Sequence, residues 1–150
     1  MKIDIADWAD GAPIPPKFAF GTIPPKGRFA LSANVNPRVA WSDAPADAKS
    51  FALICHDPDV PSVADAVNQE GKTVRPDLPR VDFFHWVLVD IPADRSEIAE
   101  GEASNGVTPR GKAPGARPYG RVGANSYTQW FAGDADMDGV YADYDGPCPP

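Results

Sequence analysis

The clearest pattern along the chain is a pair of apolar segments whose length and composition suit β-strands. Residues 51–55 are continuously apolar and lie between two turn-rich segments, which predicts a fully buried strand. Residues 84–91 form the second predicted strand, and Pro92 ends it. Strict alternation assigns this strand two faces, with Phe84, Trp86, Leu88 and Asp90 on one and His85, Val87, Val89 and Ile91 on the other.

The rest of the chain predicts short strands joined by turns and loops. Residues 38–41 are a short strand candidate, and residues 1–30 mix prolines with aromatic side chains, which favours an extended segment with edge strands. Residues 62–82 are a polar excursion between the two buried strands, and residues 101–150 are expected to be mostly ordered loop. The 18 prolines and 13 glycines favour a mainly β fold over a helical bundle.

Size and charge limit the classes of partner. A chain of 150 residues is expected to form a single domain over residues 1–150, large enough to bury a core without a metal or a disulfide. The net charge of −7 argues against nucleic acid and against a bulk anionic membrane surface. Without a secretory signal or an apolar run of 18 residues, we expect no transmembrane segment and a cytoplasmic protein. In that compartment Cys55 and Cys148 are expected to stay as thiols.

Three distant segments place polar groups at strand ends or beside rigid turns. Residues 57–61, Asp-Pro-Asp-Val-Pro, follow the first buried strand, and their prolines predict a stiff turn that presents two carboxylates. His85 begins the second strand and would lie near Asp57 and Asp59 if the two strands pair antiparallel. Cys148 stands between two prolines, so its backbone N–H is held in one direction and suits an anion, even in an acidic protein.

Taken in order, these segments resemble the signatures of the phosphatidylethanolamine-binding protein family, the Raf kinase inhibitor-like proteins, in its bacterial type. Residues 57–61 resemble the first signature loop, and residues 85–92 resemble the histidine strand. Residues 146–150 resemble the Gly-Pro-Pro loop, and residues 36–41, running on through 49–51, are similar to the segment before the first signature. The resemblance extends from about residue 30 to the end of the sequence.

The resemblance implies an antiparallel β-sandwich of a larger and a smaller sheet with few short helices. It implies a small pocket for a phosphate-like anion, in a protein that binds phospholipid headgroups or phosphorylated partners and regulates a kinase or protease, with no cofactor. It also makes Val60–Pro61 a candidate cis peptide bond. Carboxylates and donors suit a phosphate that carries an amine, so we expect a binding module and not an enzyme. The implied ligand-binding residues are Asp57, Asp59, Pro61, His85, Gly146 and Cys148.

The sequence departs from the family pattern near its end. The family continues past its Gly-Pro-Pro loop to a His-Arg-Tyr signature and a further strand and helix, whereas this sequence stops at Pro150 and has only two histidines, His56 and His85. A sheet that lacks an interior strand exposes unpaired backbone groups. We therefore expect either that the natural protein extends beyond Pro150 or that a second chain covers the open edge in a homodimer.

Two other functions stay open at this point. Asp134, Asp136 and Asp138, with Asp145 at the twelfth position, fit the spacing of a calcium loop, although neither flank predicts a helix. Asp57, Asp59 and His85 could instead supply the acid and base of an enzyme.

Overall fold

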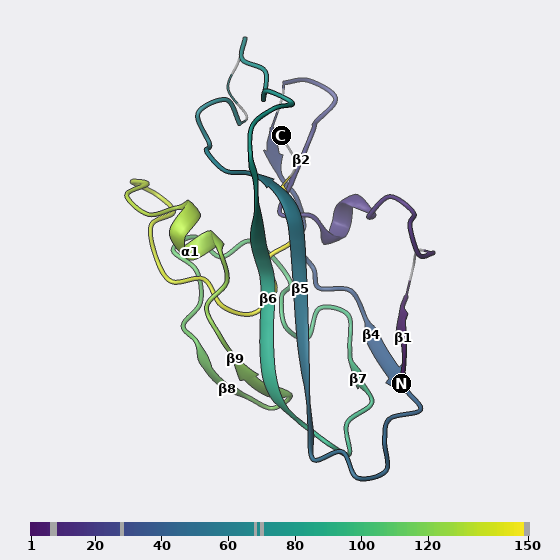
Figure 1. The fold of residues 1–150 in the computed structure, drawn as a ribbon. Helices are drawn as coiled ribbons and strands as arrows, with labels where there is room; N and C mark the ends of the chain where they lie inside the picture. The colour runs from purple at the N-terminus through teal and green to yellow at the C-terminus, as the bar shows by residue number, and fades with distance from the viewer. Residues whose placement is uncertain (7–8, 28, 68, 70, 149–150) are drawn as a thin grey trace.

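The computed structural model describes residues 1–6, 9–27, 29–67, 69 and 71–148. Its centre is a long antiparallel hairpin of β5 (Ser50–Pro61) and β6 (Arg80–Pro92), which runs the length of the molecule (Figure 1). Both strands were predicted, but each is longer than its apolar segment, because the backbone pairing continues through the polar residues that follow β5 and precede β6.

The strands form antiparallel sheets of unequal size. In the largest sheet β6 pairs with β5 and β9, and β9 pairs with β8, which gives the order β5-β6-β9-β8. A smaller sheet has the order β1-β4-β7, and β2 pairs with β3. The bounds of these elements are β1 (Lys2–Ile5), β2 (Gly21–Thr22), β3 (Ala30–Leu31), β4 (Val39–Ser42), β7 (Glu97–Ile98), β8 (Gly115–Arg117) and β9 (Gly120–Val122).

The main core lies between the larger and the smaller sheet. Val39 of β4 and Ile98 of β7 belong to the same buried cluster as Trp86 and Leu88 of β6. Burial of these apolar surfaces is the main source of stability for such a two-layer arrangement. The mainly β, antiparallel architecture predicted from the sequence is confirmed.

Two one-residue bulges in β6 change which side chains point inward. Cys55 pairs with Trp86 and the next residue of β5 pairs with Phe84, so His85 is the extra residue of the first bulge. The second bulge lies between Leu88 and Ile91, at Asp90, whose φ of 54° is left-handed. The predicted faces were therefore wrong, because strict alternation does not hold across a bulge. The β6 residues that are buried are Phe83, His85, Trp86, Leu88 and Ile91.

The Asp-Pro-Asp segment lies inside β5 and not in the predicted turn. Asp57 pairs with Phe83 and Val60 with Val81, so Pro58 and Asp59 form a third bulge. Pro58 has no N–H to give to the ladder, and the carboxylate of Asp57 accepts the N–H of Asp59 at 2.8 Å in its place. The expectation of a cis bond at Val60–Pro61 was wrong, because that bond is trans in the extended strand.

The C-terminal third of the chain is mostly ordered loop, as predicted, but it holds short elements that the sequence did not indicate. These are β8, β9 and a single helical turn, α1 (Tyr127–Trp130), while a 3-10 turn, η1 (Pro16–Phe18), lies near the other terminus. The described residues include no helix long and apolar enough to cross a membrane. No disulfide joins Cys55 to Cys148.

The calcium loop suggested by the aspartate spacing is not formed. Asp145 is fully buried and its carboxylate accepts hydrogen bonds from the side chains of Asn34 and Asn125, each at 2.8 Å. Asp134 is exposed and caps its own turn by accepting the N–H groups of Asp136 and Met137. Within the described ranges, no three His, Cys, Asp or Glu side chains gather in a way that could hold a metal ion. The spacing was met, but the buried site of Asp145 separates it from the loop.

Candidate functional site

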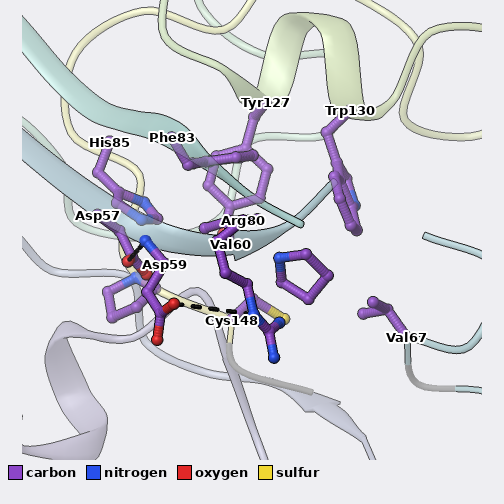
Figure 2. Close-up of a pocket in the computed structure, with 12 residues that line it drawn as sticks. Asp57, Asp59, Val60, Val67, Arg80, Phe83, His85, Tyr127, Trp130 and Cys148 are labelled. Atoms are coloured by element: carbon purple, nitrogen blue, oxygen red, sulfur yellow. Dashed lines mark hydrogen bonds and ion pairs between the residues drawn. The ribbon is translucent and has the colours of Figure 1, made fainter. Parts of the chain in front are cut away.

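A cavity of about 390 Å³ lies where the β5–β6 hairpin meets α1 and the C-terminal segment (Figure 2). Strand β5 supplies the acidic side, strand β6 supplies His85 and Arg80, and α1 supplies aromatic side chains. The volume is within the usual range of small-molecule sites. The lining residues are Asp57, Asp59, Val60, Pro61, Val67, Arg80, Phe83, His85, Tyr127, Trp130, Pro147 and Cys148.

The structure brings together five of the six residues that the family resemblance implied. Asp57, Asp59, Pro61, His85 and Cys148 all line this cavity. Antiparallel pairing places the start of β6 beside the end of β5, as expected for the histidine and the two aspartates. Their gathering in one cavity is an observation, and ligand binding by them stays a prediction.

Gly146, the sixth implied residue, lies outside the lining. Its N–H donates to the side-chain oxygen of Asn34 at 2.8 Å, and its carbonyl accepts the hydroxyl of Tyr127 at 2.7 Å. A Cβ at this position would come within 1.9 Å of the carbonyl oxygen of Phe18. Glycine is therefore required here by close backbone packing, and its effect on the site is indirect.

His85 is the central polar group of the cavity, and only 5% of its surface is exposed. Its Nδ1 donates to the backbone carbonyl of Asp145 at 2.8 Å, because a carbonyl can only accept. Its Nε2 is buried and has no hydrogen-bond partner in the described part of the chain. Burial lowers the pKa of His85 below its ordinary value, partly offset by the Asp145 carbonyl and the charge of Asp57. The imidazole is therefore neutral at pH 7, with the Nε2 lone pair available.

Asp145 holds His85 in this orientation through two backbone contacts. Its N–H donates to the carbonyl of His85 at 3.0 Å, and its own carbonyl accepts from Nδ1 of the same residue. The Asp145 carboxylate is held by two asparagine amides, and burial raises its pKa. The backbone and side chain of Asp145 thus make a rigid support for the histidine.

The open side of the cavity is acidic. Asp57 is half-buried, and the Asp59 side chain is 81% exposed. Arg80 is the one cation among the lining residues that the structure describes, and its Nε lies 3.7 Å from Oδ1 of Asp59. With His85 neutral, the two carboxylates outweigh the guanidinium. A cationic group on a ligand is therefore favoured at this side.

Three aromatic side chains complete the wall: Phe83, Tyr127 and Trp130. Phe83 contacts the other two edge-on, with ring centroids 5.0 and 6.0 Å away. Tyr127 and Trp130 are three residues apart, a spacing that places both on one face of a helical turn. That spacing could have indicated a helical turn, but the Gly, Asp and Ala residues around it favour a loop. Arg80 and Val67 were missed because the sequence assigned both to the polar excursion of residues 62–82, where nothing distinguishes them, whereas Arg80 begins β6.

Comparison with known proteins identifies the family of this chain. Residues 4–150 match the family model described as "Phosphatidylethanolamine-binding protein". The chain belongs to the phosphatidylethanolamine-binding protein family. Among curated members of the same kind, it is 30% identical over 124 residues to UPF0098 protein YbhB of Escherichia coli (strain K12), a match that covers 82% of this chain and 65% of that protein.

Two other curated relatives come from different organisms. A UPF0098 protein of Methanothermobacter thermautotrophicus is 30% identical over 117 residues, which cover 78% of this chain and 52% of that protein. A UPF0098 protein of Aquifex aeolicus is 29% identical over 126 residues, which cover 84% of this chain and 51% of that protein. This chain thus spans between about half and two thirds of the length of these relatives.

Proposed function

We propose that this chain is a binding protein for a small ligand that carries both a phosphate and an ammonium group, as a phospholipid headgroup does. The observation that carries the proposal is Nε2 of His85, which is buried and has no hydrogen-bond partner among the described residues. The charged residues that the structure places around the same cavity are Asp57, Asp59 and Arg80. A buried polar atom without a protein partner is costly unless a ligand or water completes it. The family description points to the same class of ligand.

In the proposed complex the two ends of the ligand take different parts of the cavity. The phosphate lies against Nε2 of His85, which gains a proton when the anion binds, because a nearby negative charge raises the pKa of an imidazole. The ammonium group lies toward Asp57 and Asp59, with the faces of Tyr127 and Trp130 beside it. Inorganic phosphate alone would meet the two carboxylates without a compensating cation, so it should bind more weakly than the zwitterion.

Binding, and not catalysis, is the activity that we propose. The same phosphate chemistry can be presented by a lipid headgroup or by a phosphorylated kinase or protease partner. The ammonium requirement separates these two sources, because a phosphoserine side chain carries no amine at the corresponding distance. Phosphoethanolamine and a phosphoserine peptide with blocked termini are therefore the two arms of the comparison.

Titration calorimetry with phosphoethanolamine tests the proposal. His85→Asn keeps an amide N–H for the Asp145 carbonyl but removes Nε2, and we expect it to weaken binding by about 1–3 kcal/mol, the cost of losing one charge-assisted contact. His56→Asn is the matched control, because His56 lies on the exposed face of the hairpin and does not line the cavity. Its Nε2 lies 2.8 Å from Oδ1 of Asp82. The proposal is wrong if phosphoethanolamine gives no binding, or if both variants bind it equally well.

A further inference from the structure

The cavity also contains a thiol. Cys148 is half-buried and lines the cavity, and its side chain packs against the aromatic cluster that includes Tyr127. A Cβ added to Gly21 would lie 2.6 Å from Sγ of Cys148, so the sulfur rests directly on the backbone of β2. Only glycine at position 21 allows the sulfur to occupy this place. The thiol thus lies at the cavity wall, between β2 and the aromatic cluster.

An independent observation marks the same cavity as a place that receives a molecule. Nε2 of His85, in a side chain that is 95% buried, has no hydrogen-bond partner among the described residues. A molecule that fills the cavity to complete this nitrogen shares a space of about 390 Å³ with the side chain of Cys148, since both residues line it. A ligand in the cavity and a group attached to the thiol would therefore exclude each other.

Cys55 provides a contrast within the same chain. It lies in the middle of β5, packs against the main core and is not among the cavity-lining residues. Burial, with a smaller contribution from the charge of Asp57, raises the pKa of Cys55 to about 11. Because the thiolate is the reactive form, Cys55 is nearly inert at neutral pH.

We propose that Cys148 is a thiol–disulfide exchange site which small, cationic disulfides reach through the ligand cavity, and that its modification closes the cavity to the ligand. The blocking part rests on the function proposed above. In the exchange step the Cys148 thiol loses its proton and the thiolate attacks one sulfur of the disulfide. A new S–S bond forms, the original S–S bond breaks, and the departing thiolate takes up a proton. A second thiol reverses the step.

The charges around the thiol select the class of disulfide. Asp57 and Asp59 line the cavity, and Arg80, the one cation in the described part of its lining, has its Nε 3.7 Å from Oδ1 of Asp59. A disulfide with ammonium groups is attracted to this field, whereas one with carboxylates is repelled. Once each rate is divided by the rate of the same reagent with a free small thiol, we expect a cationic disulfide to react with Cys148 about 5- to 10-fold faster than a neutral one of the same size. This is the scale of one additional favourable charge pair in a partly exposed site.

The test compares bis(2-aminoethyl) disulfide with bis(2-hydroxyethyl) disulfide on the full chain at neutral pH. Peptide mass spectrometry follows each cysteine separately, because Lys49, Lys72 and Arg121 place them in different tryptic peptides. We expect the mixed disulfide on Cys148 to form at least tenfold faster than on Cys55, with the cationic reagent ahead. Asp57→Asn should reduce that preference, measured relative to a free small thiol. Equal rates at both cysteines, or no preference for the cationic reagent, would overturn the thiol site.

A second measurement tests the blocking step on its own. Chain that carries an aminoethylthio group on Cys148, as a mixed disulfide, is titrated with phosphoethanolamine before and after reduction, beside Cys148→Ser treated in the same way. We expect binding to fall at least tenfold on modification, to return on reduction, and to be unaffected by the reagent in Cys148→Ser. Binding unchanged by modification overturns the blocking step. If unmodified chain does not bind phosphoethanolamine at all, the proposed function fails, while the thiol site is still decided by the labelling rates.

Discussion

Binding at the proposed site should strengthen as the pH falls from 8 to 6.5, because His85 must gain a proton to hold an anion. The pKa of His85 lies below its ordinary value of 6.5, owing to burial. At pH 8 protonation therefore costs at least ~2 kcal/mol, since each pH unit above the pKa costs ~1.4 kcal/mol. If the bound imidazole is fully protonated, affinity should change about tenfold for each pH unit in this range.

The assay needs a ligand that does not itself titrate between pH 6 and 8. 2-Aminoethyl hydrogen sulfate meets this condition, because its sulfate ester stays a monoanion and its amine stays protonated, whereas a phosphate monoester has a second pKa near 6. Calorimetry in two buffers with different ionisation enthalpies gives the number of protons taken up. We expect nearly one proton at pH 7.5 for the unmodified chain.

The neighbouring charges define the controls. Among the groups that act on His85, Asp57 raises its pKa and His56 lowers it. Asp57→Asn should therefore lower the pKa further and weaken anion binding across this range, and both Asp57→Asn and His56→Asn should keep the tenfold change per pH unit, because one proton is still taken up. Affinity that stays constant from pH 8 to 6.5, or a slope that persists in His85→Asn, would refute protonation of His85 as the source of anion binding.

Two further predictions concern the support beneath the cavity, and one concerns the rejected metal loop. Asn34→Ala should lower the free energy of unfolding by about 2–4 kcal/mol in urea titrations, because the buried Asp145 carboxylate and the Gly146 N–H both lose a partner. Gly146→Ala should cost at least as much, because its Cβ would overlap the backbone of Phe18; unaltered stability in either variant would contradict the packing described. Calcium should leave Trp130 fluorescence unchanged, and a saturable response would restore the metal loop.

The sequence predicted the fold class and the pairing that builds the site, because both depend on local apolar patterning. The two buried strands were found from residues 51–55 and 84–91, and their antiparallel pairing followed. The inward positions were not found, because a bulge leaves no mark in hydrophobic alternation. His85 was assigned to the face of Val87 and Val89, whereas it is buried on the side of Trp86.

The part of the site that could be predicted consists of polar or reactive residues at distinctive positions in the sequence. Asp57, Asp59, His85 and Cys148 stand out as polar or reactive groups at strand ends and between prolines, and all four line the cavity. The aromatic wall was not predicted, since α1 is one turn long and has too few residues to show helical periodicity. The spacing of aspartates assigned Asp145 to a calcium loop. Instead it is buried, and it contacts Asn34 and Asn125, which lie 111 and 20 residues away in the sequence.

Because His85 is the extra residue of the first β6 bulge, the β5–β6 hairpin can pair without it. Without His85, Phe83 and Trp86 would be two positions apart and would face the same way in an unbroken ladder, with Phe84 still opposite His56 and Trp86 still opposite Cys55. The histidine is thus an addition to an otherwise regular strand, and neither half depends on it for register. Deleting His85 should remove the ligand site and leave the two strands paired. Deleting Val87, on the other side of Trp86, would shift the register by one residue, so that the buried side chains of one half of the strand would face solvent.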